Sequence, residues 1–189
     1  MIPSSDFHSG FVALIGRPNV GKSTLMNALL GEKISIVSHH AQTTRNKITG
    51  VWNGKNSQVV FLDTPGMHKP QSKLGEVIRQ NTMDALDEVD MIVFLCACDD
   101  PLGAGDRYIL SLLKDRKVPV ILALSKIDLI SKEELLKKLV QYSKIFKFAE
   151  IVPISSKTGE NLDTLMQMIE KYLPQGPKYF PDDMVTDQP

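Results

Sequence analysis

One eight-residue motif constrains the fold of this chain more than any other feature of its sequence. Residues 16–23 read GRPNVGKS and fit the pattern G-x-x-x-x-G-K-[ST]. They follow the apolar run FVALI at 11–15 and precede the helix-like run TLMNALL at 24–30. The pattern binds phosphate where a strand delivers the loop and a helix N-terminus faces the phosphates. Because this context is present, a phosphate-binding loop is favoured over a plain glycine-rich turn.

The residues of this loop have separate predicted roles. Its glycines let backbone N–H groups turn inward around phosphate oxygens. Lys22 can reach the β- and γ-phosphates of a nucleotide, and the Ser23 hydroxyl can bind Mg²⁺. The nucleotide is expected to contact six consecutive residues: Asn19, Val20, Gly21, Lys22, Ser23 and Thr24.

Along the rest of the chain, apolar runs alternate with helical patterns. Predicted strands span 10–15, 48–52, 58–62, 91–97, 118–124 and 151–154, and predicted helices span 22–30, 74–86, 103–113, 132–145 and 162–173. Most of the strands are continuous apolar runs, as in strands buried on both faces. This alternation predicts an α/β fold of the P-loop NTPase type, with a doubly wound, mostly parallel six-stranded sheet and helices on both faces. The polar segment 53–57 predicts a hairpin, and therefore one antiparallel edge strand.

Composition and length limit the class of protein. A chain of 189 residues suggests one domain, expected over 1–173, followed by a proline-rich extended linker over 174–189 that stops where a further domain could begin. Lys plus Arg and Asp plus Glu both number 22, which lacks the basic excess of an autonomous nucleic-acid binder. With no apolar run long enough to span a bilayer and no secretory signal, a cytoplasmic location is expected. Cys96 and Cys98 are expected to be buried on one face of a strand.

A second motif, DTPG at 63–66, directly follows a predicted strand. Asp63 would lie at the carboxyl end of that strand, beside the phosphate loop, where a Mg²⁺-site carboxylate is expected. Gly66 would let a backbone N–H approach the γ-phosphate. The motif alone is common in turns, but its place after an apolar strand favours the functional interpretation.

Two later loops predict the choice of base. SKID at 125–128 resembles the guanine-reading motif N-K-x-D, and SSK at 155–157 resembles the S-A-K loop whose backbone N–H contacts guanine O6. The Asp128 carboxylate can accept two hydrogen bonds from guanine, whereas adenine offers neither and is rejected. The Lys126 stem can lie along the base. The predicted base site consists of Ser125, Lys126, Asp128, Leu129, Ser155, Ser156 and Lys157.

The ordered set of motifs resembles a translation-factor-class small GTPase. More narrowly, residues 16–23, QTTR at 42–45, and DTPG followed by HKP at 68–70 are similar to the bacterial Era GTPase family, and residues 177–181 and 185–187 resemble its linker. The resemblance covers essentially the whole chain and implies a G domain without the family's C-terminal RNA-binding KH domain. It implies GTP and GDP as ligands, and the small ribosomal subunit and its rRNA as partners through the KH domain. It also implies little RNA binding by this chain alone, a monomer, and peripheral inner-membrane association in the family.

The resemblance also assigns residues to the reaction. Thr44 matches the switch threonine that binds Mg²⁺ directly, as Ser23 does, whereas Asp63 binds it through water; Thr43 is the alternative to Thr44. Asn19 matches the position that helps to hold a potassium ion in potassium-activated relatives, although it could only shape the loop. Arg45 can be considered as an arginine finger or as part of a surface ion pair. The implied catalytic residues are Lys22, Thr44, Asp63, Gly66 and Asn19.

Two residues depart from the usual GTPase patterns. Met67 stands where Ras-type enzymes place a water-orienting glutamine, so the group that positions the water is unidentified. Ser125 replaces the usual asparagine and is expected to be too short for the same contacts, which puts nucleotide affinity in question. The sequence predicts a Mg²⁺-dependent GTPase switch in which segments 32–47 and 66–73 respond to the γ-phosphate. A docking module with negligible hydrolysis is the alternative, and Asp128 and Ser156 disfavour a P-loop ATPase or kinase.

Overall fold

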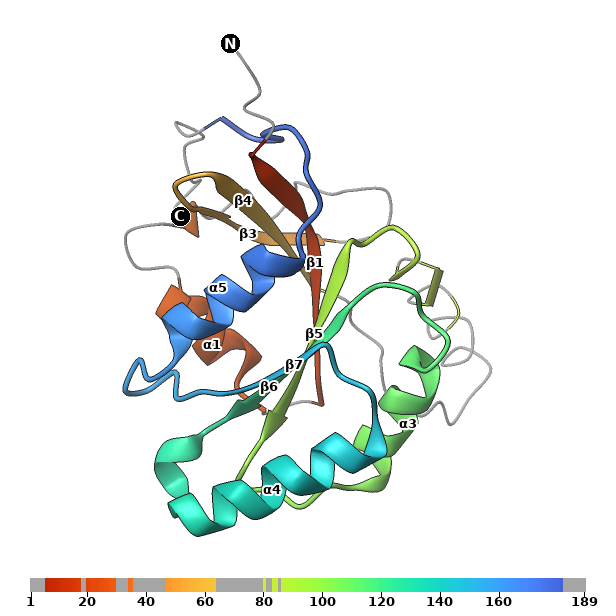
Figure 1. Ribbon diagram of the computed structural model, residues 1–189, viewed down its shortest axis with the longest axis vertical. Coiled ribbons are helices and arrows are strands. Elements are labelled where there is room, and N and C mark those ends of the chain that lie inside the picture. The colour runs from red at the N-terminus through yellow and green to blue at the C-terminus, as the bar shows by residue number, and fades with distance from the viewer. Residues whose placement is uncertain are drawn as a thin grey trace.

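The fold of the chain is a central seven-stranded sheet covered by helices on both faces (Figure 1). The computed structural model describes residues 6–17, 20–29, 34–35, 47–63, 80, 83–84 and 86–181. The strand order is β2-β3-β4-β1-β5-β6-β7. The strands are β1 His8–Ile15, β2 Ile34–Ser35, β3 Lys47–Asn53, β4 Ser57–Asp63, β5 Met91–Ala97, β6 Val120–Ser125 and β7 Glu150–Pro153. The helices are α1 Lys22–Leu29, α3 Ala104–Leu113, α4 Lys132–Ile145 and α5 Leu162–Tyr172, with a short 3-10 helix η1 over Ile127–Leu129.

All six predicted strands are present, and the predicted doubly wound sheet is confirmed. Strands β4, β1, β5, β6 and β7 are parallel neighbours in that order. The hairpin is confirmed as well, because β3 pairs antiparallel with β4, with Val51 opposite Val60. The two-residue strand β2 pairs antiparallel outside β3 and adds a seventh strand to the six expected. The predicted helix 74–86 lies largely outside the described residues.

Alternate residues of the central strands enter two separate cores, one on each face of the sheet. Val12 and Leu14 pack with side chains of α1 and α5. Ala13 and Ile15 pack with side chains of α3 and α4. Continuous apolar strands are therefore required, because both faces of the sheet are covered.

The two cysteines lie as predicted, buried on the same face of the sheet. Burial raises the pKa of the Cys96 thiol to about 12 and that of Cys98 to about 11. Within the part of the chain that the structure describes, no group of three or more His, Cys, Asp or Glu side chains could hold a metal ion.

A strap formed by residues 174–181 folds back across β1 and β4. The fully buried side chain of Gln58 holds it: the amide oxygen accepts from the backbone N–H groups of Tyr179 at 2.9 Å and Phe180 at 3.0 Å. The amide nitrogen donates to the Phe180 carbonyl at 2.8 Å. The centroid of the Tyr179 ring also lies 5.0 Å from the centroid of the Phe11 ring. The predicted linker region is therefore bound to the domain as far as Phe180.

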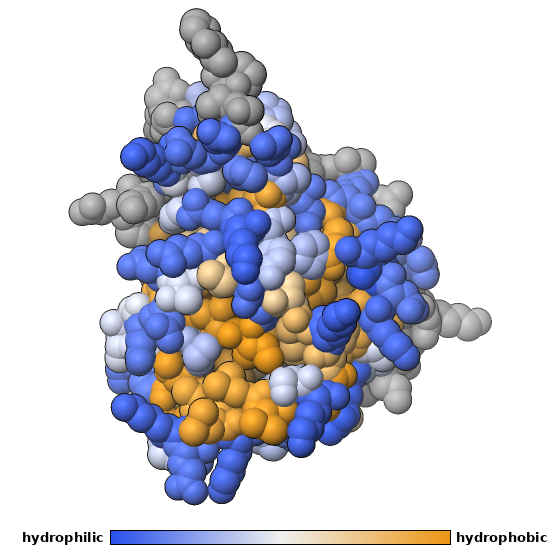
Figure 2. All heavy atoms as spheres, in the orientation of Figure 1, coloured by the Kyte–Doolittle hydropathy of each residue, from blue (hydrophilic) through white to orange (hydrophobic). Residues whose placement is uncertain are grey.

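The outer surface of α4 carries exposed apolar side chains. On α4, Leu136 is 63% exposed and Val140 is 51% exposed. Figure 2 shows apolar side chains gathered over the lower half of this face, where α4 lies in Figure 1. Among the described residues, no helix is both long and apolar enough to pass through a bilayer.

Candidate nucleotide-binding site

The motifs predicted from the sequence meet at one edge of the sheet. The phosphate loop follows β1, Asp63 ends β4, Ser125 ends β6, and Ser155 comes soon after β7. Because these strands are parallel, their carboxyl ends lie together, toward the lower end of the sheet in Figure 1. This is the edge at which open α/β sheets bind ligands.

The backbone of the phosphate loop lies tightly against β5. A Cβ atom on Gly16 would meet the Leu95 carbonyl oxygen at 2.6 Å and Val20 Cγ2 at 2.9 Å, so only glycine fits there. Gly21 has a φ of 101°, in the region that favours glycine. The Leu25 N–H then donates to the Gly21 carbonyl at 2.8 Å and begins α1. This geometry turns the chain sharply from strand to helix.

Three predicted ligand-binding side chains stand at the start of α1. Lys22 is half-buried, whereas Ser23 and Thr24 are exposed and therefore accessible to a ligand. The Val20 side chain is buried and packs in the core, so any contact of this residue with a nucleotide would be made by its backbone. The first turn of α1 thus combines polar side chains with the positive end of a helix dipole, which suits an anion.

A buried ion pair anchors the phosphate loop to α3. Arg17 Nε donates to Asp106 Oδ1 at 2.8 Å, and the Gly103 N–H donates to Asp106 Oδ2 at 3.1 Å. The Asp106 carboxylate is fully buried, and the Arg17 side chain is 32% exposed. Sequence reasoning did not identify this pair. Asp106 has only the local pattern of a carboxylate in the first turn of a helix, which does not indicate a partner so far away along the chain.

One expectation from the sequence, that Ser125 is too short to reach the phosphate loop, is wrong. Its hydroxyl lies 2.8 Å from the Val20 carbonyl oxygen and 3.1 Å from the Cys96 carbonyl oxygen. With a single proton it donates to one of the two at a time, and the Val20 contact is the shorter. Serine was expected to be too short for a bridge to the phosphate loop. It does bridge, because β6 ends directly beneath that loop.

The predicted base-reading carboxylate is held by a buried hydroxyl. Asp128 is exposed on η1, and its Oδ1 accepts a hydrogen bond of 2.8 Å from Ser155 Oγ. Ser155 is fully buried, and its Oγ in turn accepts from the Thr158 N–H at 3.1 Å. Each carboxylate oxygen has two acceptor positions, so most of the carboxylate stays available to a ligand. The sequence predicted Ser155 in the site but not this contact.

The backbone around Asp128 is shaped by an unusual conformation at Lys126. Its φ of 63° and ψ of 34° place this non-glycine residue in the left-handed region, which costs of order 1 kcal/mol. The Leu129 N–H donates to the Lys126 carbonyl at 3.0 Å and closes the turn. Leu129 is 57% exposed and is open to contact by a ligand.

The third predicted loop also comes to this edge. The Ser155 N–H donates to the Glu160 carbonyl at 3.1 Å, and the Gly159 N–H donates to the Ser155 carbonyl at 2.9 Å, so the loop is closed on itself. Ser156 is half-buried and Lys157 is exposed. Among the described residues, no carbonyl accepts from the backbone N–H of either one. As far as the described residues go, both N–H groups are available to donate to a ligand.

Several predicted site residues lie wholly or partly outside the part of the chain that the structure describes. Asp63 pairs in register with Leu14, at the same edge as the phosphate loop, but its side chain is not described. Six other residues with predicted roles lie outside the described residues: Asn19, Thr43, Thr44, Arg45, Gly66 and Met67. The Mg²⁺ and K⁺ assignments that rest on them stay predictions.

Comparison with known proteins agrees with this geometry. A sequence profile described as 50S ribosome-binding GTPase matches residues 11–126, which include the phosphate loop. The chain belongs to this GTPase family. It is 51% identical over 181 residues to GTPase Era of Clostridium beijerinckii, covering 96% of this chain and 61% of that protein.

Two solved structures of Era are also similar to the chain. One is a variant of Aquifex aeolicus Era bound to GDP·AlF₄⁻, with 41% identity and a TM-score of 0.79. The other is Era in complex with MgGDPNP and nucleotides 1506–1542 of 16S ribosomal RNA, with 42% identity and a TM-score of 0.80. Each alignment covers 97% of this chain and 63% of the solved chain. The chain thus spans about three fifths of the length of these relatives.

Proposed function

We propose that this chain is the GTP-binding domain of an Era-type GTPase that hydrolyses GTP to GDP and phosphate. The observation that carries the proposal is the pairing of two features at one sheet edge. An accessible carboxylate, Asp128, is oriented by the buried Ser155 hydroxyl, and a phosphate loop is tied to the same edge through Ser125. A carboxylate in that position can accept hydrogen bonds from two donors of guanine. Adenine lacks these donors and would leave the carboxylate unpaired.

The reaction proposed for this site depends on positioning and charge. Lys22 and the backbone N–H groups of the loop hold the β- and γ-phosphates and offset the charge that develops on them. Bound Mg²⁺ would supply further charge neutralisation at the phosphates. Ser23, which is exposed at the helix start, and Thr44 would bind the metal directly, and Asp63 would bind it through water. Water attacks the γ-phosphorus in line with the leaving oxygen, and Gly66 donates its N–H to the γ-phosphate.

The partners of the proposed protein follow from its relatives. The Era structure solved with part of 16S ribosomal RNA supports rRNA, and hence the small ribosomal subunit, as a partner of a longer Era-type protein. The formal net charge of this chain is zero, which supports weak RNA binding by these 189 residues alone. We also propose that the protein is cytoplasmic and monomeric.

Nucleotide competition tests this proposal most directly. We expect GDP and GTP to bind in titration calorimetry and ADP and ATP to bind at least a hundredfold more weakly, because adenine leaves Asp128 unpaired. Asp128→Asn should shift the preference from guanine to xanthine nucleotides, since the amide can donate to the 2-oxo group. Equal affinity for ATP would contradict the proposal. Guanine selectivity without phosphate release would indicate a docking module instead of an enzyme.

A further inference from the structure

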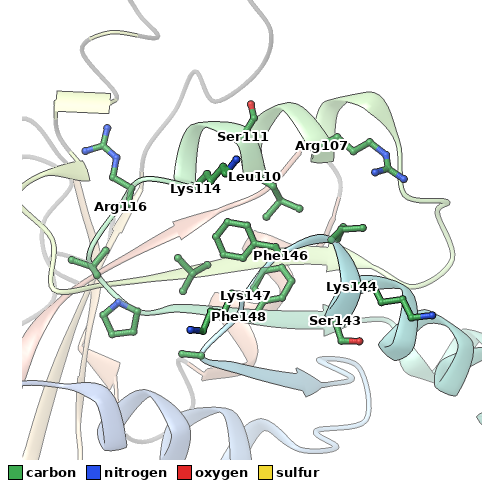
Figure 3. A pocket seen from close by; sticks show the side chains of 15 residues that line it. Arg107, Leu110, Ser111, Lys114, Arg116, Ser143, Lys144, Phe146, Lys147 and Phe148 are labelled. Atoms are coloured by element: carbon green, nitrogen blue, oxygen red, sulfur yellow. The ribbon is translucent and has the colours of Figure 1, made fainter.

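A pocket lies at the edge of the sheet opposite the candidate nucleotide site. It has a volume of about 900 Å³ and opens between α3, α4 and the residues that precede β6 and β7 (Figure 3). This volume is at the upper end of the range found for ligand pockets, roughly 300–1,000 Å³. None of the residues assigned to the nucleotide site lines it. The pocket can therefore be tested separately from nucleotide binding.

The floor of the pocket is apolar. Phe146 and Phe148 lie in the middle of it in Figure 3, with their ring centroids 4.8 Å apart and the rings tilted. Aliphatic side chains complete the floor: Leu110, Val118, Val120 and Ile145. The two phenylalanine side chains are only partly buried, so an apolar group of a partner would gain contact with them.

The rim of the pocket is positively charged. Five cations and no carboxylate are among the lining residues: Arg107, Lys114, Arg116, Lys144 and Lys147. Arg116 pairs with Asp87, and Lys144 lies in the last turn of α4, where the helix dipole offsets part of its charge. Within the described part of the chain, Arg107 and Lys147 have neither an ion pair nor a hydrogen bond to their side chains. The pocket thus has uncompensated positive charge around an apolar centre.

We propose that this pocket is a docking site for an acidic peptide segment of a partner protein, with one or two apolar anchor residues between carboxylates. An apolar centre with a charged rim is the usual anatomy of a protein interface. The apolar anchor would fill the space over Phe146 and Phe148, and the carboxylates would meet the lysines and arginines of the rim. Such charge complementarity gives partner specificity and a fast on-rate.

A peptide fits these observations better than RNA. Single-stranded RNA binds where aromatic faces are open for base stacking along a basic groove. Here the two rings pack against each other, and most of the floor is aliphatic. An apolar side chain would gain from contact with this aliphatic surface, whereas the phosphate backbone of RNA would not.

The proposal is tested by selection from a library of random short peptides against the whole chain. We expect the enriched sequences to combine aspartate or glutamate with leucine or phenylalanine. A labelled enriched peptide should bind about tenfold more weakly to the double variant Lys114→Glu, Lys147→Glu, because two favourable charges become repulsive. Both positions are exposed, and thermal melting checks that the variant folds.

The matched control is the double variant Lys55→Glu, Lys132→Glu. It makes the same change in net charge at exposed positions that do not line the pocket, and it should keep wild-type affinity. Binding to the wild-type chain should also weaken as salt increases. No enrichment, enrichment without acidic residues, or equal binding to both double variants would overturn the proposal. Competition by an oligouridine strand would assign the pocket to RNA and overturn it as well.

Discussion

The hydroxyl of Ser125 lies 2.8 Å from the carbonyl oxygen of Val20, so the end of β6 is hydrogen-bonded to the phosphate loop. Both residues are buried, and water does not replace this bond at low cost. This hydroxyl therefore helps to fix the loop relative to the segment 126–129, which directly follows Ser125.

Removing that hydroxyl should weaken both folding and nucleotide binding. We expect Ser125→Ala to lower the free energy of unfolding by about 1–2 kcal/mol and GDP affinity by roughly 5–30-fold, because the Val20 carbonyl is left unpaired. Urea unfolding and titration calorimetry measure the two effects. Ser111→Ala, at an exposed serine of α3, is the control and should change neither. Wild-type GDP affinity in Ser125→Ala would show that the bridge does not position the loop.

The buried pair Arg17–Asp106 should contribute more to stability than an exposed ion pair. Arg17→Ala leaves a fully buried carboxylate that keeps, among the described residues, the Gly103 N–H and a long contact of 3.9 Å from the Cys96 thiol, and we expect a loss of about 2–4 kcal/mol. The comparison is Arg116→Ala, whose partner Asp87 is 65% exposed, with an expected loss of about 0–1 kcal/mol.

A double-mutant cycle isolates the interaction itself. Arg17→Ala, Asp106→Asn and the combined variant should show a coupling free energy of about 1–3 kcal/mol in urea unfolding. Additive effects would mean that the two side chains contribute independently. In that case the ion pair would not explain how the loop is anchored to α3.

The Tyr179–Phe180 end of the strap should loosen when its buried glutamine is removed, whereas residues 174–177 keep their own hydrogen bonds to Phe7 and Ser9. Gln58→Ala deletes the hydrogen bonds to Tyr179 and Phe180, so we expect a loss of about 2–4 kcal/mol and faster hydrogen exchange at both amides. Hydrogen exchange measured by NMR reports the opening of the strap at these two amides directly. Gln167→Ala, at an exposed position of α5, is the control. Unchanged exchange at Tyr179 and Phe180 would mean that other contacts hold the strap.

Potassium should accelerate the proposed hydrolysis if Asn19 helps to hold a monovalent cation. Met67 has no group suited to orienting water, so another charge must offset the developing negative charge on the phosphates. We expect slow phosphate release that is faster in KCl than in NaCl. Asn19→Ala should abolish this difference and leave GDP binding nearly intact. Equal rates in the two salts for the wild-type chain would indicate that Asn19 only shapes the loop.

Local patterns predicted the elements of the fold well, for identifiable reasons. Helix α4 spans Lys132–Ile145 as expected, because Ser131 accepts a hydrogen bond from the Glu134 N–H and caps it. The place of Asp128 at the carboxyl edge of the sheet was also predictable, because it comes three residues after the end of the apolar strand β6. Contacts between distant segments were not predictable. The partner of Asp106 is 89 positions away, and Gln58 meets a strap more than 120 positions later. The reach of the Ser125 hydroxyl depended on how close β6 lies to the loop, which one sequence does not reveal.

Helix α3 connects the phosphate loop to the pocket at the opposite edge of the sheet. Its first turn holds Asp106, which binds Arg17 of the phosphate loop, and Lys114 at its end lines the basic-rimmed pocket. Ten residues of helix form a rigid rod of about 15 Å. A ligand that shifts this rod from one end changes the free energy of ligand binding at the other end wherever that binding depends on the position of the rod. Thermodynamic reciprocity requires the two changes in affinity to be equal, whichever ligand binds first.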